Sequence, residues 1–438
     1  MIGSAPEQAA GTTTDAAGNA AAPRAAEATE VAAEAPFAPS RVKLAWVAAL
    51  YFASGFPYGL VNELLPVYLR TQHVDVAAIG HVVSLVSWPW ALKFLWAPAV
   101  DRLGTRKAWI VACQLLLGAV TAALVMHSGA TLTTAVTVAL FTLAVLSATQ
   151  DIAIDAYSIE LLDERERGPA NGVRVTFYRI ALIATSGALV AASGYVGWPT
   201  VFVAAAATMF VLALVTATVP ATRRATEGRV ESIWEPVRAL GRLPHAWAIL
   251  SFVVLFRLGD YALQTMIKPF WVDSHFSTQE IGLIQGTVGI VATVAGAIVG
   301  GALVPRIGTF RALIALGAAQ AAGSLTYWAV ALAGAPRPAM WSASVIEHFT
   351  YGLGTAAFLT YLMSVCEKRY AATQFAVLTA LFAASRSIGA YFAGDAVQRM
   401  GYANFFLLTF VLALPAWMLI PVLRKTIRGS GVGGRGSR

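Results

Sequence analysis

The chain has 438 residues, of which 58% are hydrophobic and only 12% are charged, and its mean hydropathy is +0.66. An average soluble domain carries about 25% charged residues, so this composition excludes a soluble globular protein and indicates an integral membrane protein. The formal charge of +8 comes from basic residues at the ends of apolar runs, as in lipid anchors, so we expect no nucleic-acid partner.

Residues 1–40 are rich in Ala, Thr and Glu and contain no apolar segment, which predicts a disordered tail rather than a signal peptide. Runs of about 20 mostly apolar residues, the length that crosses a bilayer, follow this tail. The first six predicted spans form an N-terminal bundle over 41–219 and lie at 43–69, 77–99, 108–127, 133–161, 169–193 and 197–219.

A charged stretch at 220–245 predicts a linker, and a second bundle is predicted over 246–424. Its six spans lie at 246–272, 278–304, 311–333, 338–364, 371–397 and 401–423. Residues 425–438 form a basic tail. The fold predicted is an all-α membrane protein of twelve transmembrane helices in two six-helix bundles.

Basic residues alternate between the loops on the two sides of this arrangement. One side, with both termini and the 220–245 linker, holds 21 Lys and Arg residues, and the other side holds three. The positive-inside rule therefore predicts that both termini are cytoplasmic.

The two halves also resemble each other at a constant offset of 204 residues. VDRLGTRKA at 100–108 is echoed by VPRIGTFRA at 304–312, and DER at 163–165 by EKR at 367–369. A parallel six-helix repeat is typical of major facilitator transporters, whose substrate site lies between the halves near the midplane. The DRLGTRK string is similar to the loop signature of that superfamily, which implies gating roles for Asp101, Arg102 and Arg106. Pro305 replaces the acidic residue in the second half, so the gate is expected in the first half alone.

Charged residues inside the spans are confined to particular helices. The apolar interiors of spans 3, 6, 9 and 12 contain none, as expected if these helices lie outside and the others line a central cavity. A charge at the bilayer centre costs at least about 2.5 to 3.5 kcal/mol, so each is expected to have a partner or a task.

Span 4 ends in TQDIAIDAY, which places Asp151 and Asp155 on one helix face. Counting along the hairpin of spans 4 and 5 puts Asp151 level with Arg179 and Asp155 level with Arg174. Two interpretations remain: structural ion pairs that lock the hairpin, or a proton-coupling carboxylate whose affinity for a proton changes with conformation.

The charged residues of the second half allow similar alternatives. Arg257 and Asp260 either neutralise each other or contact substrate, and Glu347 is expected to bind the coupled proton or the substrate in the outer half of the cavity. His348 is either a polar packing residue or a proton relay. In the first half, Lys93 either reaches the cytoplasmic surface or attracts an anionic substrate.

Long strings in both halves resemble one family more specifically. YFASGFPYGL, LKFLWAPAVDRLGTRKAW, SATQDIAIDAYSIELLDERERGPANG, EHFTYGLGTAAFLTYLMS and RYAATQFAVLTAL are similar to those of AmpG-type muropeptide permeases. The resemblance implies import of GlcNAc-anhydroMurNAc and its peptides across the bacterial inner membrane in symport with protons. It also implies a transport role for Asp151 and Asp155.

We expect proton coupling at Asp151, Asp155 and Glu347, and no cofactor beyond the proton. The residues expected to contact the glycopeptide substrate are Lys93, Gln150, Arg174, Tyr178, Arg179, Arg257, Asp260, Gln264, His348, Tyr351 and Arg386. A facilitator of another cargo, such as a drug, an organic anion or an acyl-CoA, is the alternative. No hydrolase elbow, HExxH or phosphate loop occurs, so we expect no enzyme, and no metal site is expected. A monomer in the bilayer is the default for this fold.

Overall fold

The structure is a computed structural model that describes residues 40–126, 132–163, 166–221, 238, 240–242, 245–366 and 371–429. All the helices and turns within these residues belong to one compact unit. The predicted disordered tail, most of the 220–245 linker and the end of the basic tail lie outside the described residues.

The helices of the first half follow the predicted spans closely. Span 1 is α1 (Arg41–Gly59), the π-helical segment η1 (Leu60–Leu64) and α2 (Leu65–Thr71). Span 2 is α3 (Val76–Leu92), the 3-10 turn η2 (Lys93–Leu95) and α4 (Ala97–Arg102), and spans 3 and 4 are α5 (Arg106–Val125) and α6 (Thr134–Leu161). Spans 5 and 6 are α7 (Arg167–Leu182), the π-helical η4 (Ile183–Leu189) and α8 (Val190–Thr218).

The second half repeats this order. Span 7 is α10 (Ala246–Asp273), and span 8 is α11 (Thr278–Ile281), the π-helical η5 (Gly282–Val288) and α12 (Gly289–Ile307). Spans 9 and 10 are α13 (Thr309–Leu332) and α14 (Arg337–Val365), and spans 11 and 12 are both in α15 (Ala371–Gly429).

Two glycines divide the longest helices into two spans each. Nine helical stretches in the described chain are long and apolar enough to cross a membrane, and two of them, at 169–218 and 377–424, contain 50 and 48 residues. A helix rises 1.5 Å per residue, so either stretch is about twice as long as a bilayer core is thick. Both turn back at a glycine with positive φ, Gly197 (77°) and Gly401 (76°), which are themselves 204 residues apart. With α14, the described residues hold the twelve predicted spans.

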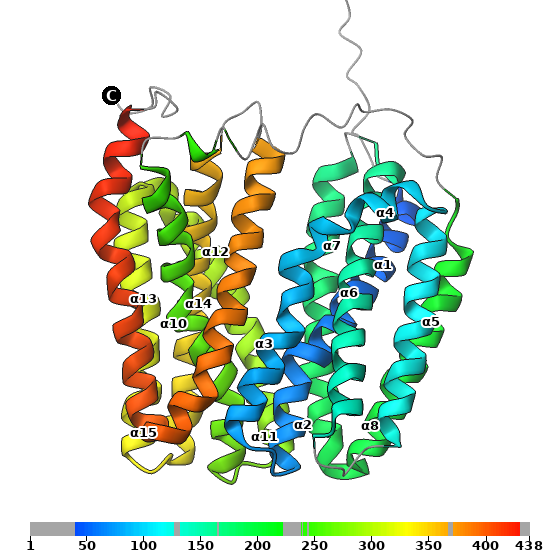
Figure 1. Ribbon diagram of the computed structural model, residues 1–438, viewed down its shortest axis with the longest axis horizontal. Helices are drawn as coiled ribbons and strands as arrows, with labels where there is room; N and C mark the ends of the chain where they lie inside the picture. Colours follow the sequence, from blue (N-terminus) through cyan, green and yellow to red (C-terminus); the bar gives the residue numbers. More distant parts are fainter. Residues whose placement is uncertain are drawn as a thin grey trace, which may run out of the picture. The chain divides into compact units, whose positions relative to one another are not determined.

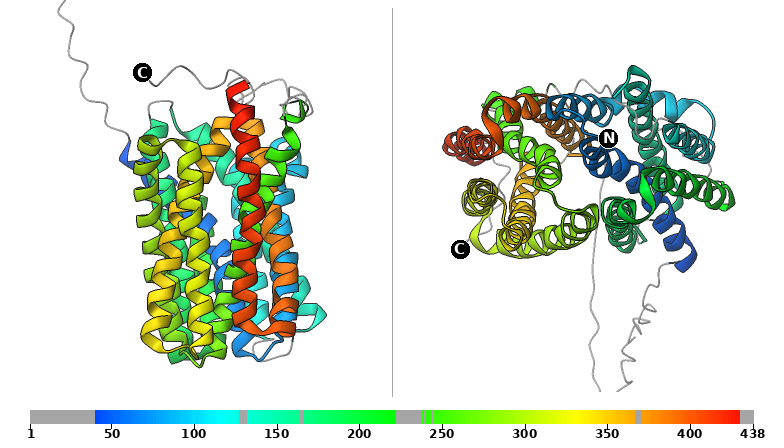
Figure 2. Two further views of the ribbon diagram at one scale, coloured as in Figure 1. Left: turned by 90° about the vertical axis from the view of Figure 1, so that its left-hand side faces the viewer. Right: turned by 90° about the horizontal axis from the view of Figure 1, so that it is seen from below.

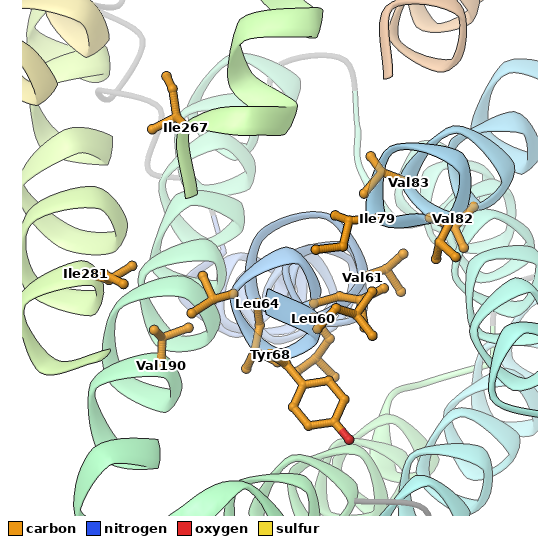
Figure 3. Close-up of a cluster of buried hydrophobic side chains, with 14 of the residues drawn as sticks. Leu60, Val61, Leu64, Tyr68, Ile79, Val82, Val83, Val190, Ile267 and Ile281 are labelled. Atoms are coloured by element: carbon orange, nitrogen blue, oxygen red, sulfur yellow. The ribbon is translucent and has the colours of Figure 1, made fainter. Parts of the chain in front are cut away.

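The buried apolar residues form one shared core at one end of the molecule and two separate cores at the other. The shared core joins side chains of both halves, including Leu64, Ile79 and Val190 from the first half and Ile267 and Ile281 from the second (Figure 3). The described chain ends at residues 40 and 429 lie at the opposite end (Figure 1). There the buried residues divide into a cluster of the second half alone and a cluster of the first half alone. The right-hand view of Figure 2 looks down the helix axes and shows the two halves side by side.

Polar bonds also join the two halves at the end that has the shared core. Arg70 Nε lies 2.5 Å from Asp273 Oδ1, and the Tyr402 hydroxyl donates to the other oxygen of Asp273 at 2.6 Å. His81 and Asp395 lie 2.9 Å apart. These contacts hold α2 and α3 against α10 and α15.

Glycines allow the backbones of the two halves to touch at this end. A Cβ at Gly286 in η5 would lie 2.0 Å from the carbonyl oxygen of Ser186 in η4, and one at Gly394 would lie 2.1 Å from the carbonyl oxygen of Val76. No side chain fits at such distances, so glycine is needed for the close approach. The crossings of η4 with η5 and of α3 with α15 therefore both include direct backbone contacts.

Small residues after Glu347 on α14 allow close packing against α12. A Cβ at Gly352 in α14 would lie 2.1 Å from the carbonyl oxygen of Thr293 in α12. This is the close approach that small residues provide in membrane helices.

We predict opposite effects for two Gly→Ala substitutions in α12. A Cβ at Gly296 would lie 2.0 Å from the Phe349 carbonyl oxygen, so Gly296→Ala should lower the free energy of unfolding by about 1 to 3 kcal/mol through overpacking. Gly301 has no atom within 4 Å of its Cβ position, so Gly301→Ala should be neutral or stabilising by up to about 1 kcal/mol. Unfolding in detergent, followed by tryptophan fluorescence, measures both. Equal stabilities of the two variants would contradict the tight α12–α14 crossing.

Candidate functional site

Acidic and basic side chains gather on the inner helices of both halves. Away from the ends of the spans, the described charged residues are Glu63, Lys93, Asp151, Asp155, Arg174, Arg179, Arg257, Asp260, Lys268, Glu347 and Arg386. They lie on η1, η2, α6, α7, α10, α14 and the first part of α15, and none lies within α5 or α13 beyond the first turn. The charges thus follow the helices expected to face a central passage.

Asp155 is held by residues from two neighbouring helices. Arg174 Nη2 lies 3.2 Å from Asp155 Oδ1, so the predicted pairing of these two residues is confirmed. Tyr51 on α1 donates its hydroxyl to the same oxygen at 2.7 Å, and the Arg174 guanidinium lies over the Tyr51 ring at 4.6 Å. The two charged side chains keep 37% and 47% of their surface exposed, so the pair borders open space.

Asp151 pairs with a different cation from the one predicted. Lys93 Nζ lies 3.2 Å from Asp151 Oδ2, and the Ser54 hydroxyl donates to Oδ1. The predicted match with Arg179 is therefore wrong. The hairpin count considered only α6 and α7, whereas η2 also packs against α6 and directs the long Lys93 side chain toward Asp151. Lys93 therefore points toward Asp151 in this conformation, and its role toward an anionic substrate stays a prediction.

Gln150 was predicted to contact substrate, and its position contradicts this. Its side chain is fully buried, and Nε2 donates to the Ala53 carbonyl oxygen at 2.7 Å. A buried amide that bonds to the backbone of a neighbouring helix fixes α6 against α1. Gln150 is a packing residue.

In the second half, Arg257 and Asp260 neutralise each other, as one of the two predicted alternatives had it. Arg257 is completely buried, with Nη1 at 3.5 Å from Asp260 Oδ2 and Nη2 donating to Thr355 at 2.6 Å. Its guanidinium stacks over the Tyr351 ring at 4.7 Å, and Gln320 on α13 donates to Asp260. Arg257 Nε is buried without a hydrogen-bond partner, and because the whole side chain is buried beside Asp260, the predicted substrate contact at Arg257 is not supported in this conformation.

Glu347 is a buried acid with no cation. Its side chain comes from α14, the residue is only 3% exposed, and Gln264 on α10 donates to Oε1 at 2.6 Å. Oε2 is buried without a hydrogen-bond partner. His348 Nδ1 lies 3.2 Å from this oxygen but interacts with the Ser344 carbonyl oxygen at 2.9 Å, while its ring packs on Gly289. The packing alternative for His348 is therefore favoured.

Two contacts between the halves at mid-depth were not predicted. Lys268 on α10 forms an ion pair with Glu63 on η1. Arg386 on α15 donates to the Tyr58 hydroxyl on α1 at 2.9 Å. The signal was present in the sequence, since Tyr51, Ser54 and Tyr58 recur at helical spacing on the face of α1 that meets these charges.

The predicted gating residues lie at the end with separate cores. The side chain of Asp101 is outside the described part of the structure, and Arg102 is exposed. Arg106 donates to the Val100 carbonyl oxygen at 2.6 Å and lies 3.4 Å from Glu160 on α6. Their gating role stays a prediction.

The ionisable groups of the inner helices therefore divide into those that form ion pairs and those that lack an oppositely charged partner. Four ion pairs form: Glu63 with Lys268, Lys93 with Asp151, Asp155 with Arg174, and Arg257 with Asp260. Among the described residues Glu347 has no Lys or Arg within 4 Å, and Arg179 and Arg386 have no carboxylate within that distance. Tyr178, beside Arg179, brings its ring to 6.0 Å from that of Tyr58.

Two helical halves that share a core at one end only, with ionisable groups between them, define a multi-pass membrane transport protein. The chain belongs to the Major Facilitator Superfamily, whose family model matches residues 47–390. It is accordingly a transporter rather than an enzyme.

Relatives and solved structures agree with this assignment. The chain is 32% identical over 388 residues to the anhydromuropeptide permease of Escherichia coli (strain K12), covering 86% of this chain and 79% of that protein. It is 29% identical to a putative transporter, AmpG 4, of Rickettsia conorii, covering 86% of this chain and 95% of that protein.

The fold is similar to that of a bacterial homologue of the human lysosomal transporter Spinster in an inward-facing conformation, with a TM-score of 0.70 at 19% identity, covering 91% of this chain and 99% of that one. It is also similar to that of a D-xylose–proton symporter, with a TM-score of 0.67 at 12% identity, covering 88% and 97%.

We predict that removing Lys93 destabilises the first half because Asp151 loses its cation. Lys93→Met should lower the free energy of unfolding by about 2 kcal/mol, less than for a fully buried pair because Asp151 keeps 22% of its side chain exposed. Adding Asp151→Asn should recover at least half of this loss, because the unpaired charge is then removed. Denaturant unfolding of the two variants in detergent is the measurement. Additive losses in the double variant would show that the two residues do not interact.

Proposed function

We propose that the chain imports muropeptides, GlcNAc-anhydroMurNAc and its peptides, across the bacterial inner membrane in symport with protons. The cargo is supported by the permease name of the Escherichia coli relative and by the family strings that the chain carries. The ion-paired and unpaired groups between the halves support a polar, charged cargo over an apolar one. Transport follows alternating access between the two halves.

We infer the orientation from the basic residues of the loops. They place both termini in the cytoplasm. The end with separate cores then faces the cytoplasm and the shared core closes the outer side, so the described conformation is inward-facing. Release of a cargo into the cell is the step that this conformation permits.

The single observation that carries proton coupling is the missing cation of Glu347. An ionised carboxylate in a buried site without a cation or a full set of donors is strongly disfavoured, so the site favours the neutral acid. Asp151 and Asp155 already have Lys93 and Arg174 as counter-ions. We therefore assign the coupled proton to Glu347, and Asp151 and Asp155 contribute by exchanging partners as the helices move.

The cargo site follows from the groups that stay accessible. Arg179, Tyr178 and Arg386 lie toward the meeting point of the halves, and Gln264 is joined to Glu347. Lys93, Arg174 and Asp155 border the same space from the first half. Arg386 faces it from the second half.

The test of coupling is uptake into proteoliposomes. Wild-type protein should accumulate labelled GlcNAc-anhydroMurNAc against its gradient when the lumen is alkaline relative to the outside. Glu347→Gln should reduce this accumulation at least 10-fold, because a neutral amide cannot carry a proton. Exchange of labelled for unlabelled cargo across the membrane should continue in this variant.

Two results separate the parts of this proposal. Wild-type protein that moves no muropeptide in either assay would remove the proposed cargo. Uptake that is driven by the pH gradient equally well in Glu347→Gln would remove Glu347 as the proton site and leave the cargo in place. Gly301→Ala, in α12 with open space around it, is the matched control and should behave as wild type.

A further inference from the structure

Arg386 is a cation held at the centre of the molecule without an acid. It lies on the first part of α15, and within the described chain its one hydrogen bond runs from Nη1 to the Tyr58 hydroxyl at 2.9 Å. No described carboxylate comes within 4 Å of it. Its Nε is buried and has no acceptor. A buried donor without an acceptor is costly on a charged group. This edge of the guanidinium therefore favours an acceptor from a bound molecule.

Aromatic rings on both sides hold the guanidinium in place. Its carbon lies 5.8 Å from the ring centroid of Tyr58 on α1 and 5.8 Å from that of Tyr261 on α10. Such cation–π contacts offset part of the cost of burying the charge without neutralising it. A guanidinium held between rings presents a rigid planar edge, which matches the two oxygens of a carboxylate.

The neighbouring acids are committed to other cations. Glu63, the nearest acid on α1–η1, is paired with Lys268, and the two aspartates of α6 are paired with Lys93 and Arg174. The second unpaired cation, Arg179, is close enough to Tyr58 to interact with it electrostatically. The region where the halves meet therefore has more positive than negative charge.

We propose that Arg386 binds a carboxylate of the transported molecule and that Tyr58 is the positioning residue for its guanidinium. This inference rests on the proposed function and deepens it, since it assigns the substrate an obligatory acidic group. Tyr58 belongs to the first half and Arg386 to the second, so the bound carboxylate lies across the boundary of the halves. Arg257, another arginine expected to contact the substrate, differs from Arg386 because it already has a carboxylate partner in Asp260 and is completely buried.

The experiment compares two forms of one probe. Peptide-bearing GlcNAc-anhydroMurNAc is prepared with free carboxyl groups and with these groups converted to primary amides. Affinities for the purified full-length protein in detergent are measured by isothermal titration calorimetry. We expect wild-type protein to bind the acid about 30-fold or more tightly than the amide, as for other closely paired charges.

The variants test whether this preference belongs to Arg386. Arg386→Gln should reduce the affinity for the acid by about 30-fold and leave the affinity for the amide within about twofold. Arg386→Lys keeps the charge without the planar edge and should fall between the two. Tyr58→Phe removes the hydrogen bond that Tyr58 accepts from the guanidinium, a bond that positions Arg386 without touching the carboxylate, and should lower the acid-to-amide ratio by about 3- to 10-fold. Arg306→Gln, which removes an exposed cation at the end of α12, is the matched control and should keep the wild-type ratio.

The outcomes distinguish this inference from the proposed cargo. Equal binding of acid and amide by wild-type protein, or an unchanged ratio in folded Arg386→Gln and Arg386→Lys, overturns the carboxylate site while the muropeptide cargo stands. If wild-type protein binds neither form, the cargo is wrong. The site is then tested with an N-acetylated acidic dipeptide and its amide as thermal stabilisers. Stabilisation by the acid that is lost in Arg386→Gln supports the site, and an equal response of both proteins overturns it.

Discussion

The cost of holding charge within a membrane decides how the centre of this protein is built. A single charge at the bilayer centre costs at least about 2.5 to 3.5 kcal/mol, and the described spans carry eleven Asp, Glu, Lys and Arg residues away from their ends. Four ion pairs cancel most of this charge, and two of them lie at the border of open space. The groups left over are therefore those with a reason to meet a proton or an anion, and they identify the working part of the molecule.

The pairs also connect the two halves to each other. Glu63 and Lys268 come from different halves, as do Tyr58 and Arg386, so both contacts must change when the halves rotate. A cargo or a proton that alters either contact changes the relative stability of the inward- and outward-facing conformations. Binding and conformational change are thus coupled through the same few side chains, because a ligand shifts a conformational equilibrium only if it interacts differently with the two conformations.

Much of the fold could be predicted from the sequence, because the bilayer imposes a strict length and polarity on each helix. The apolar runs and the 204-residue offset led to twelve spans, and the turns at Gly197 and Gly401 obey the same offset. The π-helical segments η1, η4 and η5 could not be predicted, since no side-chain pattern marks one extra residue in a helical turn. The continuation of α15 to Gly429, beyond the predicted end at 423, was also missed.

The site was predictable only in part, for a geometrical reason. Counting along a hairpin gives the depth of a residue, which was enough for Asp155 and Arg174. It does not show which third helix packs alongside, and so Lys93 was not recognised as the partner of Asp151. Nor does it show which face of a helix is packed, and Gln150 and Arg257 were expected in a cavity although both are fully buried.

The glycine seams have a mechanical consequence. Where η4 meets η5 and α3 meets α15, glycines let backbone touch backbone, while the His81–Asp395 contact also joins α3 to α15. Interlocked side chains would have to change rotamers one after another before the surfaces could part, whereas smooth surfaces can separate or slide in one movement. The closure at this end therefore combines smooth backbone contacts with polar contacts, Arg70 with Asp273 and His81 with Asp395, that must break before the halves can separate.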